Sequence, residues 1–426
     1  MSSPAIAEGP CANNPCPSGW LSIDAAQRDA VFALAEEYKD FMAVSRTEAL
    51  TVEETIERAE ARGFTEWEPG QPLSTGARHY AVNRGRSIAL FVVGSTPIVQ
   101  GARISASHID SPRLELKARP LYEAQGFALF QTAPHGGILN YQWGNTPLAL
   151  VGRVFKKDGS EVKISVGLDP DDPVFMIAGL SPHVDIDLRS RTNREVLAAE
   201  ELDPIVASIP KSATEGVQAQ VIDHLRETYG IELQDLVSAE LALVPAMRPR
   251  DVGFDRAMMA MTGQDDRFAA FASLDAMLAL DNPQRTAIAY FADNEESGNN
   301  NNTGAGSDWL VDLLGQMAAA QSGGRTPDMA RARARTRVLS TDVNDGVNPQ
   351  WPGAWEGGNA PRVSQGVNIK IYGQGNDANG EIIAWTRGWL DDADIRWQTA
   401  TYKVGRAGGG TLGGELSRRN MDVIDI

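Results

Sequence analysis

Residues 286–298 read TAIAYFADNEESG, and this stretch decides how the rest of the chain is interpreted. A short apolar run, of the kind that forms a buried strand, ends abruptly in the adjacent carboxylates Glu295 and Glu296. Because unpaired carboxylates resist desolvation, two glutamates at the mouth of a buried strand favour a bound divalent metal. One glutamate would bind the ion, and the other would take a proton from the attacking water. For an isolated pair of glutamates, a solvated turn after the strand is the commoner arrangement.

The size and charge of the chain exclude several classes of partner. Its 426 residues, 42% of them hydrophobic, can bury a full core. A net charge of -17 argues against nucleic acid or an anionic membrane as a partner, since both attract basic surfaces. No stretch approaches the roughly 20 apolar residues of a membrane span, and the N-terminus lacks the basic-then-apolar order of a signal peptide. We therefore expect a globular protein with a cytoplasmic location.

The N-terminal residues 1–20 are rich in Pro, Gly, Ser and Asn, and we expect a disordered lead-in there. Both cysteines of the chain, Cys11 and Cys16, lie in this segment. A four-residue gap without further Cys or His partners is weak support for zinc or a disulfide, so we treat the pair as incidental.

Periodicity predicts an α/β domain in most of the chain. Apolar residues at helical spacing after Asp24 predict a helix over 23–43, and a capping-box pattern of Thr51 and Glu54 predicts a second helix that stops at Gly63. The other elements expected are strands within 80–94, 102–108, 337–341, 367–372 and 396–401, helices at 266–280, 308–320 and 378–390, and a Gly/Arg-rich loop at 323–335.

A second domain is predicted inside the first. After Pro120 the sequence becomes rich in Gly, Pro and polar residues, with short β-like runs at 148–155 and 161–166 and a helical piece at 217–229. The strand–helix alternation typical of a parallel sheet resumes only after this region. We therefore expect a β-rich domain at 118–246, inserted into a domain made of 21–117 and 247–426.

Candidate metal ligands stand at the ends of four separate elements. They are His108 with Asp110, Asp265 with Asp266, Glu295 with Glu296, and Asp342. In an open α/β sheet, the carboxyl ends of strands and the amino ends of helices line the same crevice. Imidazole nitrogen together with carboxylate oxygen suits a borderline metal such as zinc. Asp110 is also the right kind of partner to fix the tautomer of His108.

Each candidate taken alone has an ordinary structural explanation. A lone His108 is more often a core or surface histidine, and Asp265 and Asp266 would be an N-cap and a first-turn acid. Asp342 could begin the turn DVNDG, and Lys370 could be an edge-strand charge. A metal centre is favoured because candidate ligands from four separate elements are all expected at the same edge of the sheet.

Several long motifs in consistent order resemble the M18 aminopeptidases, the aspartyl aminopeptidase family of dinuclear zinc exopeptidases. They are HIDSPRLELK, VPAMRPRDVGFDRAMMAMTGQDDR, FADNEESG, LSTDVN, GVNIK followed by NDAN, and RAGGGTLGG followed by MDVID. The resemblance runs from about residue 51 to the C-terminus. It implies a zinc-peptidase α/β domain with three αβα layers, interrupted by a β-rich dimerisation domain, and a homo-oligomer in which dimers form a tetrahedral dodecamer.

The resemblance also implies a role for each candidate residue. His108 and Asp342 would hold the first zinc ion, Asp265 would bridge to the second, and Glu296 would bind the second. Glu295 would be the general base, and Asp110 would orient His108. Lys370 stands where the family places a lysine that receives an acidic side chain of the substrate. The implied reaction is the release of N-terminal residues, preferentially Asp or Glu, from peptide substrates, with two Zn2+ per subunit and Co2+ or Mn2+ as possible substitutes.

One expected ligand is missing from the sequence. The family's second zinc takes a histidine shortly after the MDVID segment, and no histidine follows His224 here. We interpret this as a truncated sequence, and neither His135 nor His183 is assumed to substitute. Two alternatives stay open. The chain could be a catalytically impaired, self-assembling homologue that acts as scaffold or cargo, or a neutral-preferring aminopeptidase in which Lys370 does not face the pocket.

Overall fold

The computed structural model describes residues 17–322, 326–371, 376–403, 405 and 410–426. Cys11 and Cys16 lie outside the described residues, as does most of the lead-in predicted at 1–20. The described part of that segment includes a short 3-10 helix, Gly19–Leu21, in which the Trp20 ring stacks on Phe32 with centroids 5.8 Å apart. None of the helices in these described ranges is long and apolar enough to cross a membrane.

The chain divides into two compact units. The first comprises the residues up to Phe41 together with Val52–Asp110 and Gln264–Ile426, and the second comprises Met42–Thr51 and Ser111–Gly263. The second unit is therefore wider than the insertion expected at 118–246. At its two ends the insertion is longer because strand β5 (Arg113–Ala124) begins before residue 118 and the hairpin of β11 (Arg250–Val252) and β12 (Met258–Ala260) follows residue 246. The segment Met42–Thr51, which was not expected in this unit, also belongs to it.

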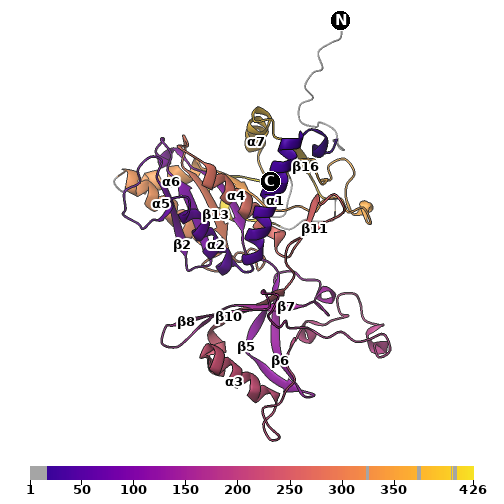
Figure 1. Ribbon diagram of the computed structural model, residues 1–426. Helices are drawn as coiled ribbons and strands as arrows, with labels where there is room; N and C mark the ends of the chain where they lie inside the picture. The colour runs from indigo at the N-terminus through magenta and orange to yellow at the C-terminus, as the bar shows by residue number, and fades with distance from the viewer. Residues whose placement is uncertain (1–16, 323–325, 372–375, 404, 406–409) are drawn as a thin grey trace. The chain divides into compact units, whose positions relative to one another are not determined.

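The first unit is built on a nine-stranded sheet with the strand order β1-β2-β3-β13-β4-β14-β17-β15-β16. Figure 1 labels β2, β13 and β16 of this sheet. Its strands are β1 (Thr65–Glu66), β2 (Arg78–Asn83), β3 (Ser87–Val92), β4 (Arg103–His108), β13 (Ala287–Ala292), β14 (Arg337–Ser340), β15 (Val367–Lys370), β16 (Trp397–Ala400) and β17 (Asp422–Asp425). The neighbours β13, β4, β14 and β17 are parallel. Their carboxyl ends therefore lie along one edge of the sheet.

Helices cover both faces of this sheet. The α-helices that lie wholly or mostly in the described part of the first unit are α1 (Ala25–Val44), α2 (Glu48–Glu60), α4 (Gln264–Ala279), α5 (Trp309–Ser322), α6 (Thr326–Ala334), α7 (Gly380–Asp392) and α8 (Gly413–Ser417). Ile104 of β4 lies in one core cluster with Leu313 of α5, whereas the next strand residue, Ser105, is hydrogen-bonded to Ser273 of α4 at 2.7 Å. Successive strand residues point to opposite faces, so α4 and α5 lie on opposite sides of the sheet. The predicted α/β class and its layers are confirmed.

The ends of several helices test the sequence predictions. Asp24 caps α1 as predicted, since its carboxylate accepts a hydrogen bond from the Gln27 N–H at 2.8 Å. The capping box predicted at Thr51 is wrong, because α2 begins at Glu48 and the buried Thr51 hydroxyl donates to the Thr47 carbonyl at 2.8 Å. The loop predicted at 323–335 is also wrong, since α6 covers Thr326–Ala334.

The second unit contains a six-stranded antiparallel sheet with the order β8-β7-β10-β5-β6-β9. Besides β5, its strands are β6 (Phe127–His135), β7 (Leu148–Phe155), β8 (Glu161–Val166), β9 (Ile205–Ala207) and β10 (Ala239–Pro245). Helix α3 (Val217–Tyr229) packs beside β5 and β6, and its Val217, Val221 and Leu225 join the core of this unit (Figure 1). The predicted β-rich character of this region is confirmed.

Candidate metal centre

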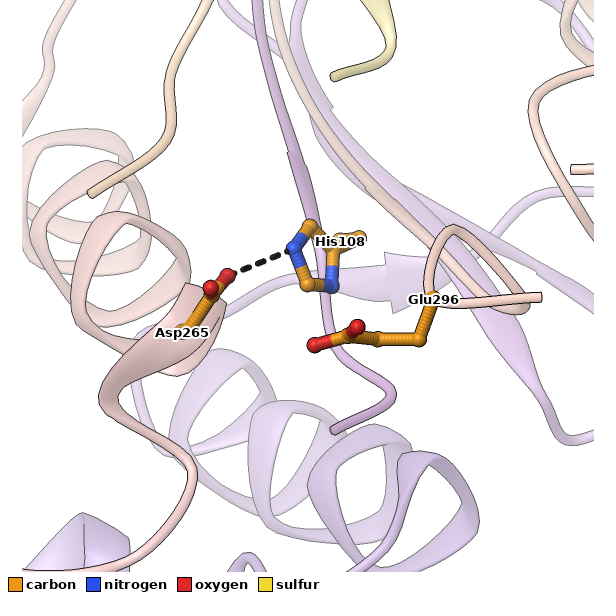
Figure 2. Close-up of side chains that lie close together, drawn as sticks. All are labelled: His108, Asp265 and Glu296. Atoms are coloured by element: carbon orange, nitrogen blue, oxygen red, sulfur yellow. Dashed lines mark hydrogen bonds and ion pairs between the residues drawn. The ribbon is translucent and has the colours of Figure 1, made fainter. Parts of the chain in front are cut away.

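His108 is the central residue of the site. It is the last residue of β4, and its side chain is only 1% exposed. Its Nδ1 lies 3.0 Å from the Asp110 carbonyl oxygen and 3.3 Å from the Asp110 carboxylate, while its Nε2 lies 3.0 Å from Oδ1 of Asp265 (Figure 2). When Nδ1 carries the proton shared with Asp110, Nε2 is the nitrogen left to bind a metal.

Asp110 also fixes the two glutamates that follow β13. Its Oδ1 accepts a hydrogen bond from the Glu295 N–H at 3.0 Å, and its Oδ2 accepts one from the Glu296 N–H at 3.2 Å. The fully buried Asp110 carboxylate thus links the strand that carries His108 to the segment that carries both glutamates. Figure 2 shows the carboxylates of Glu296 and Asp265 converging on the imidazole from different elements.

Two overlapping sets of side chains have the composition and spacing of metal-ligand groups. The ligand atoms of His108, Asp265 and Glu296 lie within 4.8 Å of one another, and so do those of His108, Asp266 and Asp342. His108 belongs to both sets. Imidazole and carboxylate donors suit zinc and similar divalent ions.

Asp266 shows that these residues fit a cation. It is fully buried, and neither of its carboxylate oxygens accepts a hydrogen bond from a side chain in the described part of the chain. Burial raises the pKa of Asp266 well above its ordinary value, and the nearby Asp342 charge raises it further. The nearby His108 and a backbone hydrogen bond from Ala269 act to lower this pKa. A buried carboxylate without a side-chain donor is costly, and a divalent ion would satisfy it.

Three other carboxylates have raised pKa values, whereas for Asp265 burial is outweighed by the hydrogen bond to His108, which lowers its pKa. Burial raises the pKa of Glu296 to about 8 and that of Asp342 to about 7, and the charge of Asp265 adds to both shifts. Burial also raises the pKa of Glu295. Burial alone would lower the pKa of His108, but its hydrogen bonds to Asp110 and Asp265 bring it well above the ordinary value. Without a cation, the cluster therefore tends to bind protons, and a bound metal would displace them.

These shifts predict how metal-free protein responds to pH. A pKa raised on folding, for a carboxyl group or a histidine, gives stability that is present below the unfolded pKa and lost as the pH rises through the folded pKa. We therefore expect the free energy of unfolding of chelated protein to fall between about pH 5 and 8, by about 1.4 kcal/mol per pH unit for each proton taken up on folding. Urea unfolding with and without saturating zinc measures this slope. Zinc is expected to flatten it, and a metal-free stability that rises over this interval would contradict the assignment.

Lys370 reaches the same edge of the sheet from the opposite direction. It ends β15, which runs antiparallel to β17, and its register partner is Asp425. Its side chain is buried. Burial raises the pKa of Glu295, Asp342 and Asp425, the last to about 6, and the positive charge of Lys370 lowers all three. Lys370 therefore lies close enough to the acidic cluster to act on it electrostatically.

The structure brings every residue singled out from the sequence to one edge of the sheet. They are His108, Asp110, Asp265, Glu295, Glu296, Asp342 and Lys370. The roles assigned to them stay predictions. Asp266, a candidate ligand to which no role was assigned, also lies at this edge. The adjacent acids at 265 and 266 were the signal in the sequence for Asp266. One acid, Asp425, was missed as a site residue. Nothing local marks Asp425.

A histidine–carboxylate cluster at the carboxyl edge of an α/β sheet, with His108 and Asp266 fully buried, is typical of a metal-dependent hydrolase. The family model "Aminopeptidase I zinc metalloprotease (M18)" matches residues 41–426. A probable M18 family aminopeptidase 1 from Clostridium acetobutylicum is 36% identical over 96% of this chain and 91% of its own. The crystal structure of an M18 aminopeptidase from Thermotoga maritima matches with a TM-score of 0.91 at 36% identity, covering 96% of this chain and 91% of that one. A Saccharomyces cerevisiae structure, the mApe1 dodecamer, shares the fold at a TM-score of 0.74 and 20% identity, over 92% and 89% of the two chains.

The chain belongs to the M18 family of aminopeptidases, as its sequence motifs led us to expect. It is a metallo-aminopeptidase, a hydrolase of peptides.

Proposed function

We propose that this chain is a dinuclear zinc aminopeptidase that releases N-terminal residues, acidic ones preferentially. The observation that supports this most directly is the pair of overlapping ligand sets that share His108, with Glu295 held beside them. His108 offers only Nε2 to a metal and would therefore bind one ion. The carboxylates of Asp265, Asp266, Glu296 and Asp342 around it supply enough donors for two neighbouring ions, with Asp265 as the proposed bridge. Cobalt or manganese accept the same donors.

Each residue has a task in the proposed reaction. His108, Asp342 and Asp265 would hold the ions with Glu296, and Asp266, a candidate ligand that was given no role from the sequence, would add a carboxylate. The bound ions supply Lewis acidity to the scissile carbonyl and lower the pKa of the attacking water. Glu295 accepts the proton of that water and passes it to the leaving amine. Asp110 keeps His108 and the Glu295 backbone in place.

The proposed acidic preference depends on Lys370. In a site with many carboxylates, a buried ammonium group is the natural partner of an Asp or Glu side chain at the substrate's N-terminus. A neutral preference is the second candidate, and Asp425 favours it. Asp425 is the register partner of Lys370 and already offers that lysine a negative charge. The two candidates differ in whether Lys370 pairs with a carboxylate of the substrate or with Asp425.

We expect Lys370→Met to reduce the preference for aspartyl over leucyl substrates by about ten- to a hundred-fold, because a hydrogen bond to a charged group contributes about 1.5–3 kcal/mol. The measurement is kcat/KM for aspartyl, glutamyl and leucyl substrates. Lys157→Met, at an exposed position of the second unit, is the matched control and should leave the ratio unchanged. Equal ratios in wild type and Lys370→Met would favour the neutral preference.

We also propose that the second unit mediates self-assembly. The support is the fold shared with the yeast mApe1 dodecamer, together with the β-rich sheet of this unit. A tetrahedral dodecamer and a cytoplasmic location, both expected from the sequence, stay predictions.

A further inference from the structure

We propose that Arg86 and Asp293 form a positioning pair that holds the segment carrying Glu295 and Glu296 against the metal centre. The inference deepens the proposed function and rests on it. Neither residue touches the reacting atoms. Both act through the backbone of the two glutamates.

Asp293 is the hub of the contacts that follow β13. It is fully buried, and its Oδ2 accepts hydrogen bonds from Nε of Arg86 at 3.0 Å, from Nδ2 of Asn301 at 3.3 Å and from Oγ1 of Thr303 at 2.6 Å. Two of these donors come from the asparagine-rich loop at 299–304, and the third comes from the turn between β2 and β3. The carboxylate therefore ties the loop and the turn to the residue two places before Glu295.

The sheet register explains why Arg86 meets Asp293. Strands β3 and β13 are antiparallel neighbours, with Phe291 paired to Ile88. Continuing this register by two residues sets Arg86 opposite Asp293. Asn83, the residue before this turn, contacts the loop itself, since its Nδ2 donates to the Asn302 carbonyl at 2.8 Å. The end of β2 and the turn after it thus contact both Asp293 and the loop.

The loop itself is folded tightly back onto the end of β13. The Asn299 N–H donates to the Asn294 carbonyl at 2.7 Å, and Asp293 forms a parallel bridge with Gly304. A Cβ at Gly304 would lie 2.9 Å from the Asn299 carbonyl oxygen, so the approach leaves no room for a side chain. The glutamates are consequently fixed from two sides, by the Asp110 carboxylate and by this folded loop.

Among the donors to Asp293, Arg86 is expected to affect turnover most, because it carries a charge. The Asp293 side chain is fully buried, and that of Arg86 is 19% exposed. Removing one partner of a buried pair leaves an uncompensated charge that the surrounding structure must move to solvate. A displacement of about 1 Å in a group that performs chemistry costs about a hundred-fold in rate. Arg86→Met is therefore expected to slow turnover by about ten- to a hundred-fold.

The test compares Arg86→Met with Arg78→Met. Arg78 belongs to the same hairpin, but its guanidinium donates to the backbone carbonyls of Leu278 and Leu280, away from the loop. Hydrogen exchange of the amides at 293–304 is measured in metal-free protein, and kcat and KM are measured with zinc. A double variant, Arg86→Met with Asp293→Asn, removes the unpaired charge.

In Arg86→Met we expect faster exchange at 293–304, a lower kcat and a KM within about two-fold, since the substrate contacts remain. The double variant should recover part of the lost kcat. Arg78→Met should change the melting temperature without changing either readout. Unchanged exchange in Arg86→Met, or faster exchange with wild-type kcat, would overturn the positioning role. If wild-type protein cleaved no peptide with zinc, the proposed function would be refuted instead. The exchange data would then show by themselves whether Arg86 and Asp293 hold the segment 293–304.

Discussion

Glu295→Gln is expected to lower kcat by about a thousand-fold while leaving metal content and KM close to those of the wild type. The substitution keeps the shape of the side chain and the backbone hydrogen bond to Asp110, but an amide cannot accept the proton of the attacking water. General-base catalysis typically contributes 10²–10⁴-fold, so a loss of about that size identifies the base. Steady-state kinetics together with elemental analysis of the same preparation make the measurement.

Glu296→Gln is the informative comparison for this variant. Glu296 is its neighbour and shares the anchor on Asp110, but we assign it to a metal. Its substitution should reduce metal content as well as rate. Glu68→Gln, at an exposed position, should change neither quantity. If Glu295→Gln kept its activity, or lost metal to the same extent as Glu296→Gln, the division of roles between the two glutamates would be wrong.

His108→Ala is expected to have the second large effect, namely loss of the bound metal together with a loss of activity of at least about a thousand-fold. His108 is the imidazole donor of both candidate ligand sets and the proposed ligand of the first ion, so its removal takes away the one nitrogen donor of these sets. Metal assistance is worth several kcal/mol of transition-state stabilisation, which corresponds to on the order of 10³-fold in rate. Zinc affinity by competition with a chromophoric chelator, and activity at saturating zinc, are the two readouts.

His135→Ala provides a control of similar burial. His135 lies in the second unit, where its Nδ1 is 3.2 Å from the Glu115 carboxylate. Its removal should change stability but leave zinc affinity per chain unchanged. Wild-type zinc affinity and turnover in His108→Ala would show that the metal centre lies elsewhere.

Local patterns predicted the elements of the fold well. The runs at 148–155, 161–166 and 217–229 coincide with β7, β8 and α3, because each is a short stretch with one clear period between turn residues. The errors arose where a short motif predicted one local structure and the neighbouring residues favour another. Glu54 suggested a capping box but pairs with Arg58 along the helix at 2.5 Å. The Gly and Arg residues near 330 suggested a loop, yet Ala, Met and Arg favour the helix α6.

The candidate site was predictable to the extent that it follows from topology. His108, Glu295, Glu296 and Asp342 all follow parallel strands, and a common rim was inferred from that alone. Contacts that depend on how two neighbouring strands are aligned were not predictable in this way. Asp425 meets Lys370 because β15 and β17 run antiparallel, and Arg86 meets Asp293 because β3 and β13 do. Neither strand direction nor register can be read from one short apolar run.

A zinc titration of chelated protein tests the metallo-aminopeptidase assignment most directly. The readout is release of the N-terminal residue from an aspartyl peptide and from the same peptide acetylated at its N-terminus. We predict no cleavage without metal, recovery that saturates at about two zinc ions per chain, and no cleavage of the acetylated peptide, because an exopeptidase of this kind holds the free amino group. Cleavage that persists without metal, or equal cleavage of both peptides, would contradict this function. Zinc uptake without any cleavage would favour the alternative of a catalytically impaired homologue that acts as a scaffold or cargo.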